Sequence, residues 1–256
     1  MFNGLKIGQT GMNTAQKVMD NVADKIANGS TPGYKKAQVG FQELLRNEMG
    51  GQEVPLGQSA TGSSVGIGSR AVRQKTDFTP GAILPTEGPW DLALEGDGFF
   101  GVLLENGTLA LTRNGAFQRG AEGMLTDSQG HPLVVDEAVP AAAWPSGKLT
   151  VTAEGRILGE GNAVLGQILR FAPGNVDELI PLGEGRFLPT AGADVRNSRE
   201  NPETSFGPIR QGALESSNAD ALESLTEMIV TQRAYQANAK SLTTADEMLE
   251  AINTIL

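Results

Sequence analysis

The last forty residues, 217–256, read SNADALESLTEMIVTQRAYQANAKSLTTADEMLEAINTIL and contain neither proline nor glycine. A large apolar side chain recurs at every seventh position from Met228 to Leu256, the period of a helix that buries one stripe. At the helical rise per residue, such a stretch would span about 60 Å. Ser217 with Asp220 three residues later resembles a capping box, which predicts that Ser217 caps the start of the helix, and Glu223 adds an acidic group in the first turns.

A second pattern with the same period occupies the first 28 residues. A large apolar residue stands at every seventh position from Leu5 to Ile26, and Ala15 and Val22 fill a companion line. Gly29 is expected to end this helix in a left-handed cap. In the STPGYK sequence that follows, proline and then glycine at the two central positions predict a tight turn. The chain is therefore expected to begin and to end in a helix.

The two terminal segments carry opposite charges. Residues 1–36 contain five lysines and two aspartates, a net charge of +3, whereas residues 215–256 contain seven acidic and two basic residues, a net charge of −5. Opposite charges beside matching apolar stripes predict that the helices pair as a coiled coil. Since a two-helix coil keeps an outer surface, we expect other molecules to complete the helical layer. The side chains expected in this assembly interface are Leu5, Met12, Ala15, Met19, Val22, Ile26, Leu225, Met228, Tyr235, Ala239, Leu242, Leu249 and Leu256.

Between the helices, residues 71–213 read as short strands separated by turns. DLALEGDGFF and VLLENGTLALTRNGAF are apolar or alternating, and Asn106-Gly107 between apolar runs is a strong hairpin signal. KLTVTAEGRIL predicts another hairpin, and AVLGQILRF predicts a further apolar strand. Short strands at this spacing indicate an antiparallel β domain rather than β-α-β units.

A glycine-rich stretch, residues 50–69, separates the first helix from these strands. It contains six glycines and few large apolar groups, so it cannot bury enough surface to offset the entropy of ordering. We expect an extended connector that becomes ordered against a partner. The predicted fold class is α+β, with the N-terminal helix of a helical core domain in residues 1–36, the connector in 37–70, the β domain in 71–213 and the C-terminal helix in 214–256.

The overall composition excludes several classes of function. The chain has 30 acidic and 20 basic residues, a net charge of −10, which argues against a nucleic-acid partner because phosphate binding needs a basic face. It has no cysteine, which excludes disulfides, thiol catalysis and thiolate metal sites. The N-terminal residues do not read as a cleaved secretory signal, and no segment approaches the roughly 18 apolar residues of a membrane span. We expect no cofactor and no metal.

Three local features resemble parts of enzymes. Residues 96–101, GDGFFG, satisfy the pattern GxGxxG, but the dinucleotide fingerprint requires a helix after the third glycine, and a strand follows here. We interpret the stretch as a tight bend with two aromatic residues packed under a sheet. His131 is the only histidine, and without a G-x-S-x-G elbow we interpret it as a solvent-exposed turn residue. Glu122 and Asp127 could act as an acid–base pair, but their spacing does not distinguish them from surface charge.

Both ends and the centre of the chain resemble the bacterial flagellar axial proteins of the rod, the hook and the hook-associated structures. The N-terminal segment ends in the ANxxTxGYK-like sequence ANGSTPGYK, and the C-terminal segment contains QRAYQANAK and DEML. DLALEGDGFFGVLLENGTLALTRNGAF is similar to the family's central β motif. Where the family often has two asparagines, this chain has Asp24-Lys25. The residues that match the terminal motifs include Asn28, Thr31, Gly33, Tyr34, Gln232, Arg233 and Asn238.

The resemblance implies a structural protein rather than an enzyme. Such proteins are exported unfolded through the flagellar type III apparatus without a cleaved leader, and they polymerise helically into a hollow shaft lined by their terminal helices. The length and the uninterrupted last helix are most similar to subunits of the distal rod, which carry torque from motor to hook. A proximal rod paralogue or a hook-type subunit of the same family is the alternative.

The resemblance also implies partners and a location. The expected partners are other copies of the chain, the adjoining rod proteins, the hook protein, bushing ring proteins and the export apparatus. The expected location is the rod of the basal body, which is partly periplasmic where an outer membrane is present. Two other classes remain open: a secreted β-rich hydrolase that uses carboxylates, and a monomeric coiled-coil adaptor whose ends are folded at any concentration.

Overall fold

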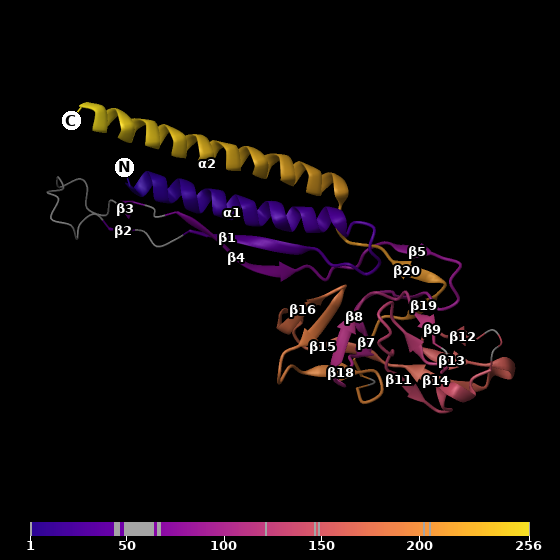
Figure 1. Cartoon of the computed structure of the whole chain (residues 1–256). Coiled ribbons are helices and arrows are strands. Elements are labelled where there is room, and N and C mark those ends of the chain that lie inside the picture. The colour runs from indigo at the N-terminus through magenta and orange to yellow at the C-terminus, as the bar shows by residue number, and fades with distance from the viewer. Residues whose placement is uncertain are drawn as a thin grey trace. The chain divides into compact units, whose positions relative to one another are not determined.

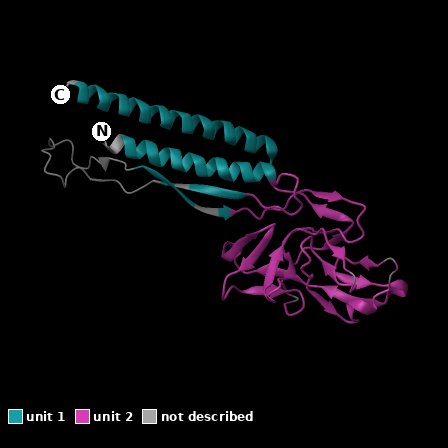
Figure 2. Ribbon diagram, in the orientation of Figure 1, with its two compact units in different colours: residues 1–27, 37–75, 220–256 teal, residues 28–36, 76–219 magenta. Residues whose placement is uncertain are grey.

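A computed structural model of the chain (Figure 1) describes residues 2–43, 47–48, 64–65, 68–120, 122–145, 147, 149–201, 203–204 and 206–255. These residues fall into two compact units (Figure 2): unit 1 comprises residues 1–27, 37–75 and 220–256, and unit 2 comprises residues 28–36 and 76–219. Unit 1 contains the two long helices, and unit 2 contains most of the strands. The predicted α+β class is confirmed. None of the described helices is long and apolar enough to cross a membrane.

Unit 1 contains the helices α1 (Phe2–Ala27) and α2 (Ala221–Ile255), which pack along each other (Figure 1). The Asp220 carboxylate caps α2, because its Oδ1 accepts hydrogen bonds from the N–H groups of Leu222 (2.7 Å) and Glu223 (3.1 Å). The prediction that Ser217 caps this helix is therefore wrong. The Ser217 hydroxyl oxygen instead accepts a hydrogen bond from the N–H of Ala219 at 3.1 Å, ahead of the helix.

The turn after α1 confirms one prediction and corrects another. The N–H of Tyr34 donates to the carbonyl of Thr31 at 3.3 Å, and Gly33 has a φ of +68°, as the STPGYK sequence predicts. Gly29 does not have a positive φ, so the expected left-handed cap at this residue is wrong. In this turn, the left-handed conformation occurs at Gly33 instead of Gly29.

Unit 1 also contains β1 (Ala37–Glu43) paired with β4 (Ser69–Thr76), and β2 (Asn47–Glu48) paired with β3 (Ser64–Val65). The start of β4 lies against α1: the Thr14 hydroxyl donates to the Ser69 carbonyl at 3.2 Å, and a Cβ on Gly68 would lie 2.1 Å from the hydroxyl oxygen of Thr10. Residues 50–63 and 66–67 of the glycine-rich stretch lie outside the described residues. The extended connector therefore stays a prediction.

Unit 2 contains a six-stranded sheet with strand order β16-β17-β8-β7-β15-β18 and a four-stranded sheet with order β11-β14-β13-β12. Each register described for these sheets is antiparallel, as predicted. The strands of the larger sheet are β7 (Phe99–Leu103), β8 (Leu109–Thr112), β15 (Arg170–Pro173), β16 (Leu179–Gly183), β17 (Arg186–Pro189) and β18 (Val195–Asn197). Those of the smaller sheet are β11 (Val135–Glu137), β12 (Thr150–Val151), β13 (Arg156–Leu158) and β14 (Val164–Ile168).

Shorter elements complete unit 2. Three antiparallel pairs join β5 (Ile83–Pro85) with β20 (Ala213–Glu215), β6 (Leu92–Leu94) with β19 (Ile209–Gln211), and β9 (Gln118–Arg119) with β10 (Leu125–Thr126). Three single-turn 3₁₀ helices are η2 (Ala141–Ala143), η3 (Glu160–Asn162) and η4 (Val176–Glu178). The β5–β20 pair lies beside the segments through which the chain enters and leaves unit 2.

The predicted hairpins are confirmed. Strands β7 and β8 are joined around Asn106-Gly107, where Gly107 has a φ of +75° and its N–H donates to the Leu104 carbonyl at 2.8 Å. KLTVTAEGRIL forms the β12–β13 hairpin, with Gly155 at a φ of +84°. AVLGQILRF was predicted as one strand, which is wrong: it supplies β14 and the first two residues of β15, and these strands belong to different sheets.

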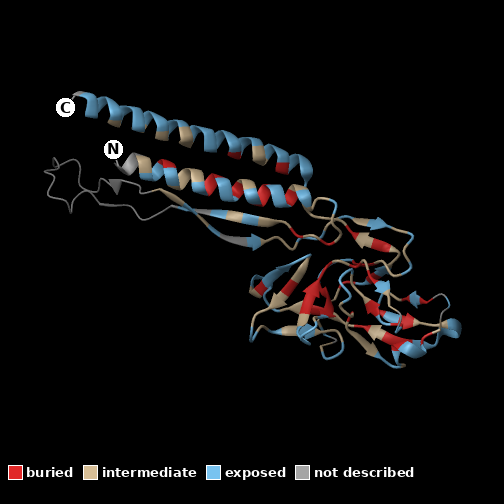
Figure 3. Cartoon of the chain, viewed as in Figure 1, coloured by how far each residue is buried: buried red, intermediate tan, exposed pale blue. Residues whose placement is uncertain are grey.

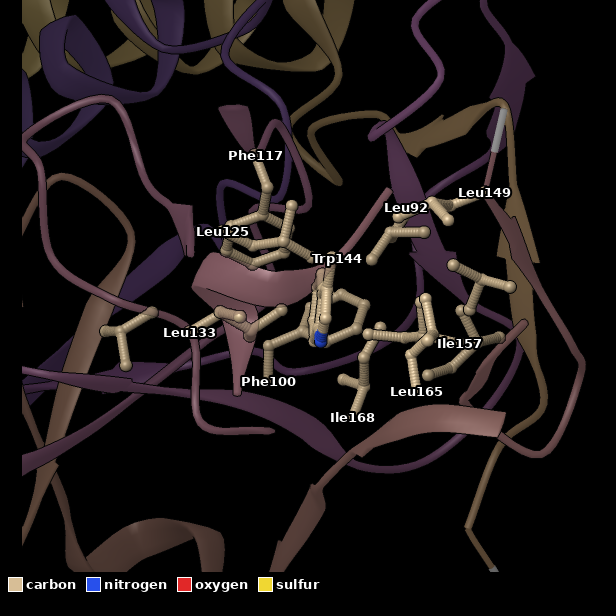
Figure 4. Close-up of a cluster of buried hydrophobic side chains, with 14 of the residues drawn as sticks. Leu92, Phe100, Phe117, Leu125, Leu133, Trp144, Leu149, Ile157, Leu165 and Ile168 are labelled. Atoms are coloured by element: carbon tan, nitrogen blue, oxygen red, sulfur yellow. The ribbon is translucent and has the colours of Figure 1, made fainter. Parts of the chain in front are cut away.

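The two faces of β7 bury different apolar clusters. Phe100 belongs to the larger cluster with Trp144 (Figure 4), whereas Phe99 belongs to a smaller cluster with Leu111 and Phe187. This follows from the strand itself, because successive side chains point to opposite faces of a sheet. The expected bend therefore lies at the start of residues 96–101. The two buried aromatic residues, Phe99 and Phe100, follow it and begin β7 rather than a helix.

Candidate assembly surface

One line of α1 is buried along the length of the helix. It consists of Gly8, Ala15, Val18, Val22 and Lys25, all of them buried. The spacing alternates between three and four residues except across Gly11, so these residues face one side, as in the seam of two packed helices. Of the residues predicted for the interface, Ala15 and Val22 lie in this line. The remaining predicted residues of α1 lie beside it and are half-buried: Leu5, Met12, Met19 and Ile26.

The helices approach closely where α1 has glycine. A Cβ on Gly8 would lie 3.6 Å from both the Asn238 carbonyl oxygen and the Leu242 side chain, and a Cβ on Gly11 would lie 2.7 Å from the Asn238 side-chain oxygen. The Asn238 amide is held in this position by donating to the Ala234 carbonyl at 2.9 Å. The family-motif residue Asn238 therefore fills the space that Gly11 leaves open.

One ion pair joins the two helices near the other end of α1. The Lys25 Nζ lies 2.9 Å from Glu227 Oε2, and the Lys25 side chain is only 9% exposed, whereas that of Glu227 is 40% exposed. A pair that is partly open to water contributes about 0–1 kcal/mol, so its main effect is on register.

Much of α2 is exposed (Figure 3), and its exposed residues include large apolar side chains. Leu222, Leu225 and Ile229 are spaced i, i+3 and i+7, which places them on one face of the helix. Exposed large apolar groups in such a row are typical of an interaction surface. We define the outer face of α2 by its six most exposed large apolar side chains, which are 42–76% exposed: Leu222, Leu225, Ile229, Val230, Met248 and Ile252.

The predicted residues of α2 are divided between its two faces. Leu225 lies on the outer face, and Tyr235 is 37% exposed. The motif residues Gln232 and Arg233 are exposed, and Leu256 lies outside the described residues. The remaining predicted residues are half-buried: Met228, Ala239, Leu242 and Leu249.

Most of the outer face was missed by the search for a strict seven-residue repeat. The i, i+3, i+7 spacing of Leu222, Leu225 and Ile229 could have revealed it. Two polar residues on the inner side of α2 were also missed: Ser224 and Thr231 are buried, and their hydroxyls donate to carbonyls of the preceding turn. A helix that buries small hydroxyl side chains and exposes leucine and isoleucine is not fully covered by α1.

The N-terminal motif residues 28–34 form a turn inside unit 2. The Thr31 hydroxyl donates to Asn28 Oδ1 at 3.2 Å, and the Gly33 N–H donates to the Glu215 carbonyl at 2.7 Å. A Cβ on Gly33 would lie 2.4 Å from the backbone nitrogen of Asn114, so only glycine fits. The Tyr34 carbonyl accepts from the backbone N–H of Asn218 at 3.3 Å. These contacts position the backbone of the motif within unit 2.

Three charged side chains are buried together beside this turn. Lys35 Nζ lies 2.6 Å from Glu215 Oε1, and an Arg113 guanidinium nitrogen lies 3.3 Å from Glu215 Oε2. The three side chains are at most 3% exposed. Burial lowers the pKa of Lys35 below its usual value of 10.5, and the hydrogen bond to Glu215 opposes that effect. Burial lowers the pKa of Arg113 in the same way.

The residues considered for catalysis do not form a site. His131 is only 16% exposed, so its interpretation as a solvent-exposed residue is wrong: its Nδ1 lies 3.2 Å from Asp127 Oδ2, and Arg186 packs against it. Asp127 Oδ1 accepts from the N–H groups of Gln129 and His131, so it holds the turn, whereas Glu122 is exposed. In the described part of the chain, no three acidic or histidine side chains gather in a way that could hold a metal ion.

The comparisons with known proteins agree with this arrangement. The model of the flagellar hook protein FlgE/F/G D1 domain matches residues 93–159, and that of the flagellar basal body rod FlgEFG protein C-terminal region matches residues 210–255. Flagellar basal-body rod protein FlgG of Agrobacterium fabrum is 33% identical over 98% of both chains, and FlgG of Bacillus subtilis is 31% identical over 98% of both. FlgF of Escherichia coli is 30% identical over 96% of both chains.

The two matched regions identify the class as flagellar axial proteins of the hook and rod type. The similarity to relatives extends over nearly the whole chain. The chain belongs to the flagellar basal-body rod protein family of FlgG, and it is a structural protein of the flagellar rod.

Proposed function

We propose that this rod protein assembles helically with other copies of itself into a hollow shaft that transmits torque from the motor to the hook. In this proposal α1 and α2 pair as a coiled coil, and the outer face of α2 is covered by neighbouring subunits. The single observation that carries the proposal is the exposure of six large apolar side chains on α2, each of which is 42–76% exposed. The function is mechanical and involves no catalysis.

The energy available at this face supports assembly. Fully burying one large apolar side chain contributes about 1.5–3 kcal/mol, so covering the exposed parts of six would contribute roughly 5–10 kcal/mol per subunit. That amount is comparable to the net stability of a whole domain. A second copy is a suitable cover, because the acidic end of α2 (Asp246, Glu247 and Glu250) complements the lysines of α1.

The remaining expectations belong to the same proposal. The proposed segments are the helical core residues 1–36 and 214–256, a connector in 37–70 and a β domain in 71–213. The proposed partners are adjoining rod proteins, the hook protein, bushing ring proteins and the type III export apparatus. Similarity to relatives named flagellar basal-body rod proteins supports a rod position. The alternative to a distal rod subunit is a proximal rod paralogue or a hook-type subunit of the same family.

Ile229→Asp tests the proposal. Ile229 is 53% exposed, so the substitution should leave the helical content and the unfolding midpoint of the dilute protein nearly unchanged. It places a charge within the proposed contact, so cells that carry only this variant should assemble no rod beyond the adjoining proteins and should not swim.

Ile229→Leu is the matched control, because it keeps the apolar area and should restore rods and swimming. Electron microscopy of isolated basal bodies shows which segment of the rod is present. Rods of normal length in Ile229→Asp cells would contradict the proposal.

A further inference from the structure

The chain passes between the two units four times, at residues 27/28, 36/37, 75/76 and 219/220. On the unit 2 side, these passages leave three segments: 28–36, the residues that follow 76, and those that precede 219. All three meet within unit 2 at one place. We call this place the junction and define it by residues 33–36, 77–82 and 215–218, all of which belong to unit 2.

Asn218 binds the other two segments at once. Its side-chain oxygen accepts from the N–H of Lys36 at 2.7 Å, and its amide donates to the carbonyls of Asp77 (2.8 Å) and Thr79 (3.1 Å). Its own backbone N–H donates to the carbonyl of Tyr34 at 3.3 Å. The N–H of Asp77 donates to the Lys36 carbonyl at 2.8 Å, which closes the ring of three segments. The Asn218 side chain thus supplies hydrogen bonds between the three segments that backbone groups would supply in a β-sheet.

Glu215, which is buried, also joins the three segments. Its Oε1 accepts from Lys35 Nζ at 2.6 Å and from the N–H of Gly81 at 2.9 Å. The same Lys35 Nζ donates to the Thr79 carbonyl at 2.8 Å. A Cβ on Gly81 would lie 2.0 Å from the Ser216 carbonyl oxygen, so the segments touch backbone to backbone. Again, each of the three segments is bound to the other two.

We propose that the junction shares mechanical load among the connections between unit 2 and unit 1, with Asn218 and Glu215 as its positioning residues. This rests on the proposed function, since it is torque in an assembled rod that loads these connections. Bonds that join all three segments at one place are loaded together, so a pull on one connection is distributed to the others. A buried ion pair is weak support for stability but can fix a particular geometry. A connection that transmits force requires such a fixed geometry.

The first test follows hydrogen exchange in the purified full-length protein. Asn218→Ala removes the acceptor for the Lys36 N–H and weakens the ring around the Asp77 N–H. Since one hydrogen bond contributes roughly 0.5–1.5 kcal/mol, the exchange of these two amides should become up to about tenfold faster. The amide of Phe100, in the core of unit 2, should keep its protection.

Asn197→Ala is the matched control. Asn197 is half-buried like Asn218, and its side chain accepts from the N–H groups of Arg199 (3.1 Å) and Glu200 (2.8 Å), outside the junction. This variant should leave the Lys36 and Asp77 amides protected. Unchanged exchange in Asn218→Ala, or equal loss in both variants, would overturn the proposal.

The second test measures function under load. Cells with Asn218→Ala should build rods and hooks in normal number and swim normally in dilute medium, but they should lose speed or shed filaments as viscosity rises. Asn197→Ala cells should match wild type at every viscosity. Asn218→Ala cells that match wild type throughout, or that build no rods, would refute load sharing at the junction.

A further variant keeps the test decisive if Asn218→Ala does not fold. Asn218→Asp preserves the acceptor for Lys36 but removes both donors, so it should accelerate exchange less and lie between Asn218→Ala and wild type in viscous medium. Equality with wild type would overturn the proposal. The proposal of helical assembly is tested separately, because normal rods in Ile229→Asp cells would contradict that proposal and not the one about the junction.

Discussion

Units 1 and 2 bury their side chains in different ways. In unit 2, leucines, isoleucines and phenylalanines from both sheets are almost completely buried in two clusters (Figures 3 and 4). In unit 1, the buried positions of α2 hold Ser224 and Thr231, and six of its large apolar side chains are 42–76% exposed. The difference supports the proposal that further copies cover α2, whereas the core of unit 2 is buried within one chain.

The largest effect should come from the core of unit 2. Phe100 is fully buried, so Phe100→Ala should lower the free energy of unfolding by about 3–5 kcal/mol through lost burial and a cavity. Both tryptophans, Trp90 and Trp144, belong to unit 2, so urea unfolding followed by tryptophan fluorescence reports this unit alone.

The matched change on the outer face of α2 should have almost no effect on the dilute protein. Ile229→Ala should alter its stability by about 0.5 kcal/mol or less, measured by circular dichroism of the helices. If Ile229→Ala destabilised the dilute protein as much as Phe100→Ala does, the two units would not differ in the way described.

An effect of similar size should come from the buried charges of unit 2. Glu215→Gln leaves Lys35 and Arg113 buried without their carboxylate, which should cost about 3–5 kcal/mol. Glu95→Gln, which removes a half-exposed partner of Arg210 in the same unit, should cost about 0–1 kcal/mol. Urea midpoints at neutral pH compare the two, and equal losses would show that burial does not decide the value of these pairs.

The pH dependence of the same variant has a defined sign. Burial already lowers the pKa of Lys35 in the folded protein, and loss of Glu215 removes the group that opposes this. The unfolded chain then binds more protons than the folded chain between the lowered pKa and the usual value of 10.5, so stability rises with pH in that window. The deficit of Glu215→Gln relative to wild type should therefore shrink as pH rises toward that value.

The smallest effect concerns Asp77 in the junction. The N–H of Thr79 lowers the pKa of this carboxyl below 3.8, and Lys36 and Lys35 act in the same direction. Because the folded pKa is lowered, the stabilisation by Asp77 is present above its usual pKa and is lost as pH falls through the folded value. Asp77→Asn keeps an acceptor for Thr79 but cannot titrate, so it should lose slightly less stability than wild type between about pH 5 and pH 2. If the urea midpoints of Asp77→Asn and wild type fell equally as the pH is lowered, Asp77 would not contribute to the pH dependence of stability.

Local sequence signals predicted most of the secondary structure. The Asn106-Gly107 hairpin and the turn ending at Tyr34 were predicted because their geometry depends on a few adjacent residues. The cap of α2 was placed at Ser217 instead of Asp220, because both side chains can cap and only the folded backbone decides which one does. The predicted solvent exposure of His131 was wrong for a related reason, since Arg186 reaches it from a strand 55 residues away.

The sequence alone determined that the chain begins and ends in helices, that antiparallel strands lie between them, and that a strand rather than a helix follows Gly96 and Gly98. These follow from periodicity and from turn residues, which act over a few positions. Only the tertiary structure decided which line of α1 is buried, because Gly8 and Gly11 allow an approach to α2 that larger residues would prevent. It alone also placed Lys35, Glu215 and Arg113 together, because burial of charge depends on residues that are distant in the chain.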